Sequence, residues 1–95
     1  MAWTAVAGHV VECFWSGVRE EDLPAIDRRI RAAAAQVVAG ERVRYLGCLL
    51  ILDDEVVLCL FEGPIATVRE VTQRAGVPFE RILRSSRTAC TRRRT

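Results

Sequence analysis

The stretch VRYLGCLLILDDEVVLCLFE, residues 43–62, decides the fold class of this chain. It contains two apolar runs, 43–52 and 55–62, which are rich in Val, Ile and Leu and are separated by Asp53 and Asp54. Runs of this length and composition predict β-strands, and paired aspartates between them predict a turn. The stretch therefore predicts a β-hairpin.

Both faces of this predicted hairpin are apolar. A turn at Asp53-Asp54 places Tyr45 opposite Glu62 and Cys48 opposite Cys59. Because side chains alternate along a strand, residues then divide between two faces. One face carries Leu46, Cys48, Leu50, Val57, Cys59 and Phe61; the other carries Tyr45, Gly47, Leu49, Ile51, Val56, Leu58, Leu60 and Glu62. We expect both faces to be covered.

The segments on either side of the hairpin predict two helices and two further strands. Apolar residues at three- and four-residue steps predict amphipathic helices at 23–37 and 65–75. Runs rich in β-branched and aromatic residues predict strands at 9–15 and 79–85. The order βαββαβ predicts the ferredoxin-like fold of the α+β class, a four-stranded antiparallel sheet with both helices on one face. Because two helices can cover only one face, we expect a homodimer that covers the other.

Composition limits the domain organisation and the partners. We expect residues 1–86 to form one domain and the polar, Arg-rich segment 87–95 to be a disordered tail. The chain has 14 basic and 12 acidic residues, and this balance argues against a nucleic-acid partner. Its longest apolar run is too short to span a membrane, so we expect a cytoplasmic protein.

Several short segments resemble a known family. They are ECFW at 12–15, VRYLG at 43–47, CLFE at 59–62, VREV at 68–71 and AGVPFERI at 75–82. Together they resemble a bacterial family of small ferredoxin-like domains, most without known function, that includes a nickel-binding protein. The resemblance covers about residues 10–84. It implies a dimer in which two sheets face one another, as in dimeric α+β barrels, with metal binding as a property of some members.

Three polar side chains inside the apolar strands form the candidate ligand-binding site. Glu12, Tyr45 and Glu62 would be costly to bury unless they bind one another or a ligand. A pocket between facing sheets would use the carboxylates as a base or cation ligands and the tyrosine as a donor. Alternatively, Glu62 ends its strand in solvent. Glu12 would then pair with an arginine: Arg44, Arg81 or Arg84.

His9 is the candidate metal ligand because it is the single histidine of the chain. It cannot share an ion with Cys13, because four residues of extended strand span roughly 13 Å. Two copies of His9 could meet across a dimer interface. Otherwise His9 is a partly exposed residue at the start of a strand. Facing Cys48 and Cys59 side chains predict inert packing, and Cys90 is expected to be the reactive thiol.

These features predict a small dimeric ferredoxin-like domain that binds a metal ion, nickel, or a small ligand between facing sheets. One alternative is a dimeric α+β barrel enzyme of the oxygenase or isomerase type. Another is a regulatory module that binds a protein partner. No nucleophile-elbow, phosphate-loop or dinucleotide motif decides among them. An enzyme requires a polar-lined pocket, whereas an interaction module tolerates a filled interface.

Overall fold

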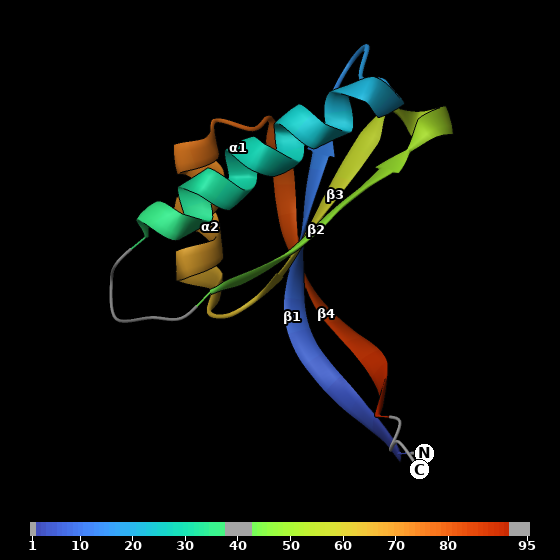
Figure 1. Ribbon diagram of the computed structural model, residues 1–95, viewed down its shortest axis with the longest axis vertical. Helices are drawn as coiled ribbons and strands as arrows, with labels where there is room; N and C mark the ends of the chain where they lie inside the picture. The colour runs from blue at the N-terminus through green and yellow to red at the C-terminus, as the bar shows by residue number, and fades with distance from the viewer. Residues whose placement is uncertain (1, 38–42, 92–95) are drawn as a thin grey trace.

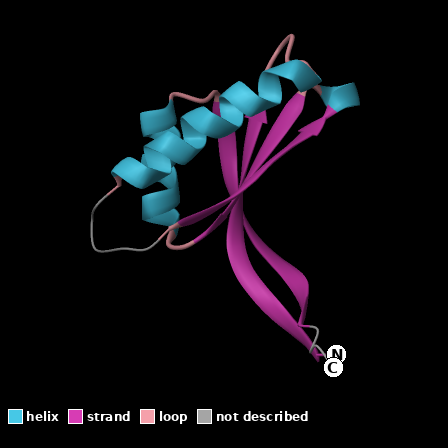
Figure 2. Cartoon of the chain, viewed as in Figure 1, coloured by secondary structure: helices cyan, strands magenta, loops and turns pink. Residues whose placement is uncertain are grey.

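The computed structural model describes residues 2–37 and 43–91, and these form one sheet and two α-helices. In chain order the elements are β1 (Ala2–Phe14), η1 (Glu20–Asp22), α1 (Leu23–Gln36), β2 (Arg44–Ile51), η2 (Leu52–Asp54), β3 (Val56–Glu62), α2 (Ile65–Ala75) and β4 (Phe79–Thr91). The antiparallel strands lie in the order β2-β3-β1-β4, and both helices cover the same face (Figure 1, Figure 2). The predicted ferredoxin-like α+β fold is confirmed.

The helices form where apolar residues make one stripe. In α1 the buried residues are Ile26, Ile30 and Ala33, spaced three or four apart. Arg29, on the same helix, donates hydrogen bonds to the backbone carbonyls of Ala75 and Gly76, where α2 ends. A guanidinium group there stabilises the negative end of the α2 dipole. Within the described residues, no helix is long and apolar enough to cross a membrane.

The core lies between the helices and the covered face of the sheet. Its strand residues alternate with outward-facing ones, as the pleat requires. They include Val11 and Cys13 of β1 and Val57, Cys59 and Phe61 of β3, each at most 1% exposed. Burying a side chain such as that of Phe61 contributes roughly 1.5–3 kcal/mol. Because these residues face the helices, the strand residues next to them face the opposite side of the sheet.

A β-bulge changes the hairpin register near Tyr45. From Gly47 to Ile51 the strands pair as predicted, including Cys48 opposite Cys59. The register then shifts between Tyr45 and Gly47, so Tyr45 faces Phe61 and not Glu62. Gly47 has a φ of 118°, a conformation that glycine adopts far more readily than other residues. The predicted pairing of Tyr45 with Glu62 was therefore wrong.

The two outer ends of β1 and β4 form a ribbon that projects beyond the rest of the sheet (Figure 1). β1 pairs with β3 only as far as His9 opposite Phe61, whereas it pairs with β4 from Ala2 to Cys13. We call residues 2–7 and 86–91, which pair with one another, the arm. In the described part of the chain, β1 and β4 are each other's only strand partners in the arm.

The arm changes the expected boundary of the domain. We predicted a strand at 79–85 and a disordered tail from residue 87, but β4 continues to Thr91. Residues 87–91 find backbone hydrogen-bond partners because β1 begins at Ala2 rather than at residue 9. The remaining residues of the predicted tail, 92–95, lie outside the described residues.

Candidate functional site

The face of the sheet opposite the helices, which we call the open face, is largely apolar. Phe14 and Leu49 are about half exposed there, at 52% and 51%, and Leu83 is 38% exposed. Leu58 and Leu60 of the central strand β3 are partly exposed beside them. Both described helices lie on the other side, so the open face is not covered by them (Figure 2). An apolar surface of this kind typically marks an interaction site.

Glu12 lies on the open face and forms an ion pair. Its register partner on β4 is Arg81, whose Nε donates a 2.8 Å hydrogen bond to Glu12 Oε1. The Glu12 side chain is only 17% exposed. The hydrogen bond to Glu12 raises the pKa of Arg81. The structure thus gives Glu12 the arginine partner that our alternative interpretation expected.

Glu62 lies on the same face and binds two arginines. Its Oε2 accepts a 2.8 Å hydrogen bond from Arg87, and its Oε1 lies 3.3 Å from Arg44 Nη1. Its side chain is 20% exposed. Arg87 falls in the segment for which we predicted disorder, and the extension of β4 brings it to Glu62.

A pocket of about 230 Å³ adjoins the Glu62–Arg87 ion pair. Apolar side chains of Val10, Leu46 and Leu60 contribute to its lining, and Glu62 and Arg87 add the charged groups. We call this cavity the Glu62 pocket. It combines an apolar lining with a localised polar pair, the arrangement that orients small ligands in proteins.

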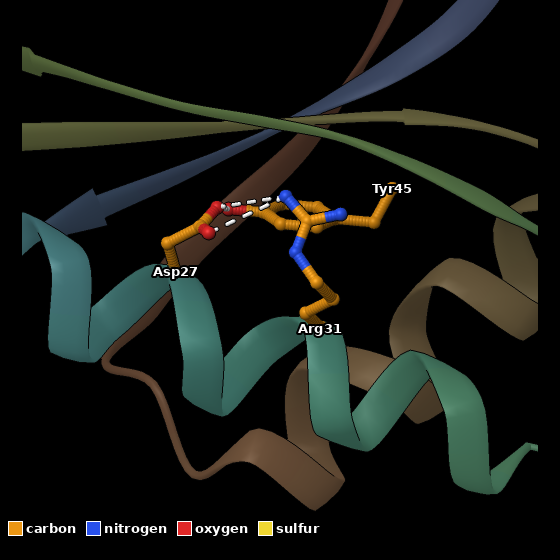
Figure 3. Close-up of polar contacts among 3 residues, drawn as sticks. All are labelled: Asp27, Arg31 and Tyr45. Atoms are coloured by element: carbon orange, nitrogen blue, oxygen red, sulfur yellow. Dashed lines mark hydrogen bonds and ion pairs between the residues drawn. The ribbon is translucent and has the colours of Figure 1, made fainter.

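Tyr45 lies on the opposite, helix-covered side of the sheet. Its hydroxyl donates a 2.8 Å hydrogen bond to Asp27 Oδ1 of α1 (Figure 3). Arg31, one turn further along α1, lies 3.3 Å from both Asp27 oxygens, and its guanidinium carbon is 5.1 Å from the centre of the Tyr45 ring. The predicted Glu12–Tyr45–Glu62 cluster is therefore divided: the two carboxylates share the open face, and the tyrosine fastens α1 to β2.

The environment of Tyr45 predicts how stability depends on pH. Burial, followed by hydrogen bonds with Cys48 and Asp27, raises its pKa well above the usual 10.0. The unfolded chain releases this proton near pH 10, whereas the folded protein retains it. The stability contributed by Tyr45 is therefore complete below pH 10 and decreases as the pH rises further.

We expect Tyr45→Phe to lower the free energy of unfolding at neutral pH by about 0.5–1.5 kcal/mol, because the hydrogen bond to Asp27 is lost. The same substitution should flatten the decline in stability at alkaline pH. Denaturant unfolding at a series of pH values measures both effects. Because the chain has one tyrosine, tyrosinate absorbance reports on this group alone. Ordinary tyrosine titration in the folded protein would contradict the assignment.

His9 does not belong to a metal centre in the described residues. It pairs with Phe61 on β3 and Arg84 on β4, and strand alternation separates it from the side of Glu12 and Glu62. Nowhere in the parts of the chain that the structure describes do three or more His, Cys, Asp or Glu side chains form a group that could hold a metal. The described residues of a single chain therefore form no metal-binding group, and the nickel site that the family resemblance implies stays a prediction.

The described cysteine thiols lie on the helix-covered side. Cys13 and Cys59 are fully buried, and Cys48 is partly buried. A hydrogen bond with Cys13, together with burial, raises the pKa of Cys59 and keeps it protonated. This agrees with the expected inert packing. The side chain of Cys90 lies outside the described residues.

The sequence did not predict three side-chain contacts, which are Tyr45 with Asp27, Tyr45 with Arg31, and Glu62 with Arg87. Asp27 and Arg31 are four residues apart on α1, a spacing that signals an intrahelical ion pair but not a contact with Tyr45. Arg87 was assigned to the tail, and only its strand pairing could have linked it to Glu62.

Comparisons with protein-family models, with curated proteins and with solved structures find no match to this chain. Its class is therefore defined by the fold itself, a ferredoxin-like α+β domain with an extended β1–β4 arm.

Proposed function

We propose that this chain works as a homodimer whose open faces pack together and enclose a small ligand in the Glu62 pocket. The observation that carries the proposal is the apolar open face, with its half-exposed Phe14 and Leu49 and a pocket beside paired charges. Leaving such a face in water is costly, and burial in a second copy removes that cost.

A second copy fits this face because both of its carboxylates are already paired with arginines of the same chain. Glu12 is bound by Arg81, and Glu62 is bound by Arg87 and Arg44. Two such faces related by a two-fold axis would therefore meet without strong repulsion. A partner of high net charge would find no complementary field on this surface.

The dimensions of the face and the arm are consistent with a dimer interface. Four strands about 4.8 Å apart and about seven residues long have a flat area of roughly 450 Å², and the arm adds roughly 200 Å². Stable interfaces bury about 800 Å² per partner, so the face and arm together approach that size. An isolated two-stranded ribbon is only marginally stable in water, and contact with a partner would stabilise the arm.

The Glu62 pocket indicates the class of ligand. Its apolar lining of Val10, Leu46 and Leu60 favours a small, mostly apolar molecule. The guanidinium of Arg87 and the carboxylate of Glu62 would orient one polar group of that molecule. A facing copy of the chain would close the pocket against water.

Light scattering tests the assembly. The 10.6 kDa chain should elute with twice that mass, and native mass spectrometry of freshly purified protein should show additional mass on the dimer if a ligand is retained. Leu46→Trp should fill the pocket and remove that additional mass while the dimer persists. Leu52→Trp is the matched control, because Leu52 is 58% exposed in η2 and does not line the pocket.

A monomer at high concentration would contradict the assembly. A dimer without retained mass, and with no thermal stabilisation by small apolar acids or amides, would contradict the ligand part of the proposal. That second result would favour the alternative of an interaction module, which needs only a filled interface.

A further inference from the structure

We propose that the helix-covered side of the sheet, at the base of the arm, binds the anionic group of a small organic molecule through Arg84 and His9. The group is an oxyanion, either a phosphate or a carboxylate. The site adjoins the Glu62 pocket, with which it shares the lining residues Ala7, Gly8, His9 and Ser85. Strand alternation nevertheless directs Arg84 and His9 to the side of the ribbon opposite Glu62.

The end of β3 creates a groove at this point. Pairing between β1 and β3 stops at His9 and Phe61, and β3 ends at Glu62, whereas β1 and β4 continue into the arm. The space left beside the ribbon has a volume of about 600 Å³, and its lining includes Ala7, His9, Gly63, Arg84 and Ser86. Ala7 and Gly63 leave it unfilled because their side chains are small or absent.

Arg84 differs from the other arginines of β4. Arg81 and Arg87 face the open side, where Glu12 and Glu62 bind them. Arg84 is oriented to the other side by strand alternation, and it is exposed. Among the described residues it takes part in no ion pair, and no carboxylate side chain is among the described residues that line the groove. Its guanidinium is therefore available to an oxyanion, which it binds through two parallel hydrogen bonds.

His9 lies directly across from Arg84 and contains an unsatisfied atom. The two residues are register partners on β1 and β4, so their side chains leave the ribbon on the same side. His9 Nδ1 is buried and has no hydrogen-bond partner within the described part of the chain. Buried polar atoms are nearly always hydrogen-bonded, and a rotation of the imidazole that turns this nitrogen into the groove would let a ligand supply the missing partner. The Ser86 hydroxyl, two residues beyond Arg84, adds a donor on that side.

The volume of the groove indicates more than a bare ion. Sites for small organic molecules have volumes of about 300–1,000 Å³, and this groove falls within that range. A ligand with an organic body attached to its anionic group would place the anion at Arg84 and the body over Ala7 and Gly63.

Nuclear magnetic resonance of the imidazole protons tests the site directly, because His9 is the only histidine of the chain. The full chain is titrated separately with inorganic phosphate, glucose phosphate and succinate. We expect a saturable shift of the His9 signals. If the site binds phosphate, the affinity should be highest for glucose phosphate, and if it binds carboxylate, the affinity should be highest for succinate. Arg84→Gln should weaken that binding about tenfold or more, because a charge-assisted pair of hydrogen bonds is lost.

Arg28→Gln is the matched control, because it removes the same charge from an exposed position of α1 and should leave the affinity unchanged. Arg84→Lys keeps the charge but loses the planar fork, and intermediate affinity is expected. If Arg84→Gln does not fold, Arg84→Lys still measures how much the guanidinium of Arg84 contributes to anion binding. The proposal is overturned if no probe gives a saturable shift, or if Arg28→Gln weakens binding as much as Arg84→Gln. Light scattering on the same samples reports the dimer separately.

Discussion

Replacing Leu58 with glutamate should convert the proposed dimer into a monomer. Leu58 lies on the central strand β3 and faces Leu49 on one side and Glu12 on the other. The substitution loses roughly 1.5–3 kcal/mol of apolar burial per chain, and a two-fold interface contains the substitution twice. It also places a second carboxylate opposite Glu12, which adds like-charge repulsion. A total loss of about 4 kcal/mol weakens dimerisation roughly a thousandfold.

Sedimentation or light scattering across a range of concentrations measures this effect. Arg28→Glu provides the control: it also adds negative charge, but on an exposed part of α1, so the dimer should be retained. Leu83→Glu is a second variant of the open face at a position that is 38% exposed, where a charge should disturb the fold of one chain less. If Leu58→Glu and Leu83→Glu both keep the molar mass of the native protein, the open face is not the interface.

The sequence predicted the fold well because its strongest signals are local. Apolar spacing placed α2 at residues 65–75, the limits that the structure has. Aspartates 53 and 54 correctly predicted the pairing of Cys48 with Cys59, although the connection is a 3-10 turn with Glu55 in a left-handed conformation. These features depend on neighbouring residues, so periodicity and turn chemistry were sufficient to predict them.

The candidate site was only partly predictable, and the reason is the bulge. Alternation correctly put Glu62 on the face opposite the buried Phe61. It failed for Tyr45, because one extra residue before Gly47 reverses the side on which every preceding residue lies. A glycine inside a strand was the only signal of that bulge, and it is a weak one.

The arm was missed for a different physical reason. Segment 86–91 has a polar composition and no apolar periodicity, and such segments are usually disordered. Its strand structure depends on partners in β1 that lie 79 to 89 residues earlier in the chain, from the pairing of Ser86 with Ala7 to that of Thr91 with Ala2. Pairing at that distance leaves no local pattern in either segment. The interaction of Arg87 with Glu62 depends on the same pairing, so the sequence did not predict it either.

Replacing Gly8, which lies at the base of the arm, with alanine should destabilise the domain strongly. Gly8 lies where β1 separates from β3, and a Cβ atom there would collide with the backbone carbonyl oxygen of Phe61. Because the obstacle is backbone at the end of a buried strand, it cannot move aside as a flexible side chain would. Overpacking of this kind costs about 1–3 kcal/mol, which for a domain of this size lowers the melting temperature by on the order of 10 °C.

Comparing the melting temperatures of Gly8→Ala and Ser85→Ala distinguishes this collision from the effect of any small change in the β1–β4 ribbon. Ser85 is the register partner of Gly8, so Ser85→Ala changes a side chain at the same place in the ribbon without adding a Cβ that meets the backbone of Phe61. We expect Ser85→Ala to change the melting temperature by no more than a few degrees. Amide hydrogen exchange should show faster opening of the β1–β3 pairs near Phe61 in Gly8→Ala, because the strands must move apart to admit the methyl group. Equal stability and equal exchange in the two variants would mean that β1 passes Phe61 at a greater distance, and the base of the arm would then need a different geometry.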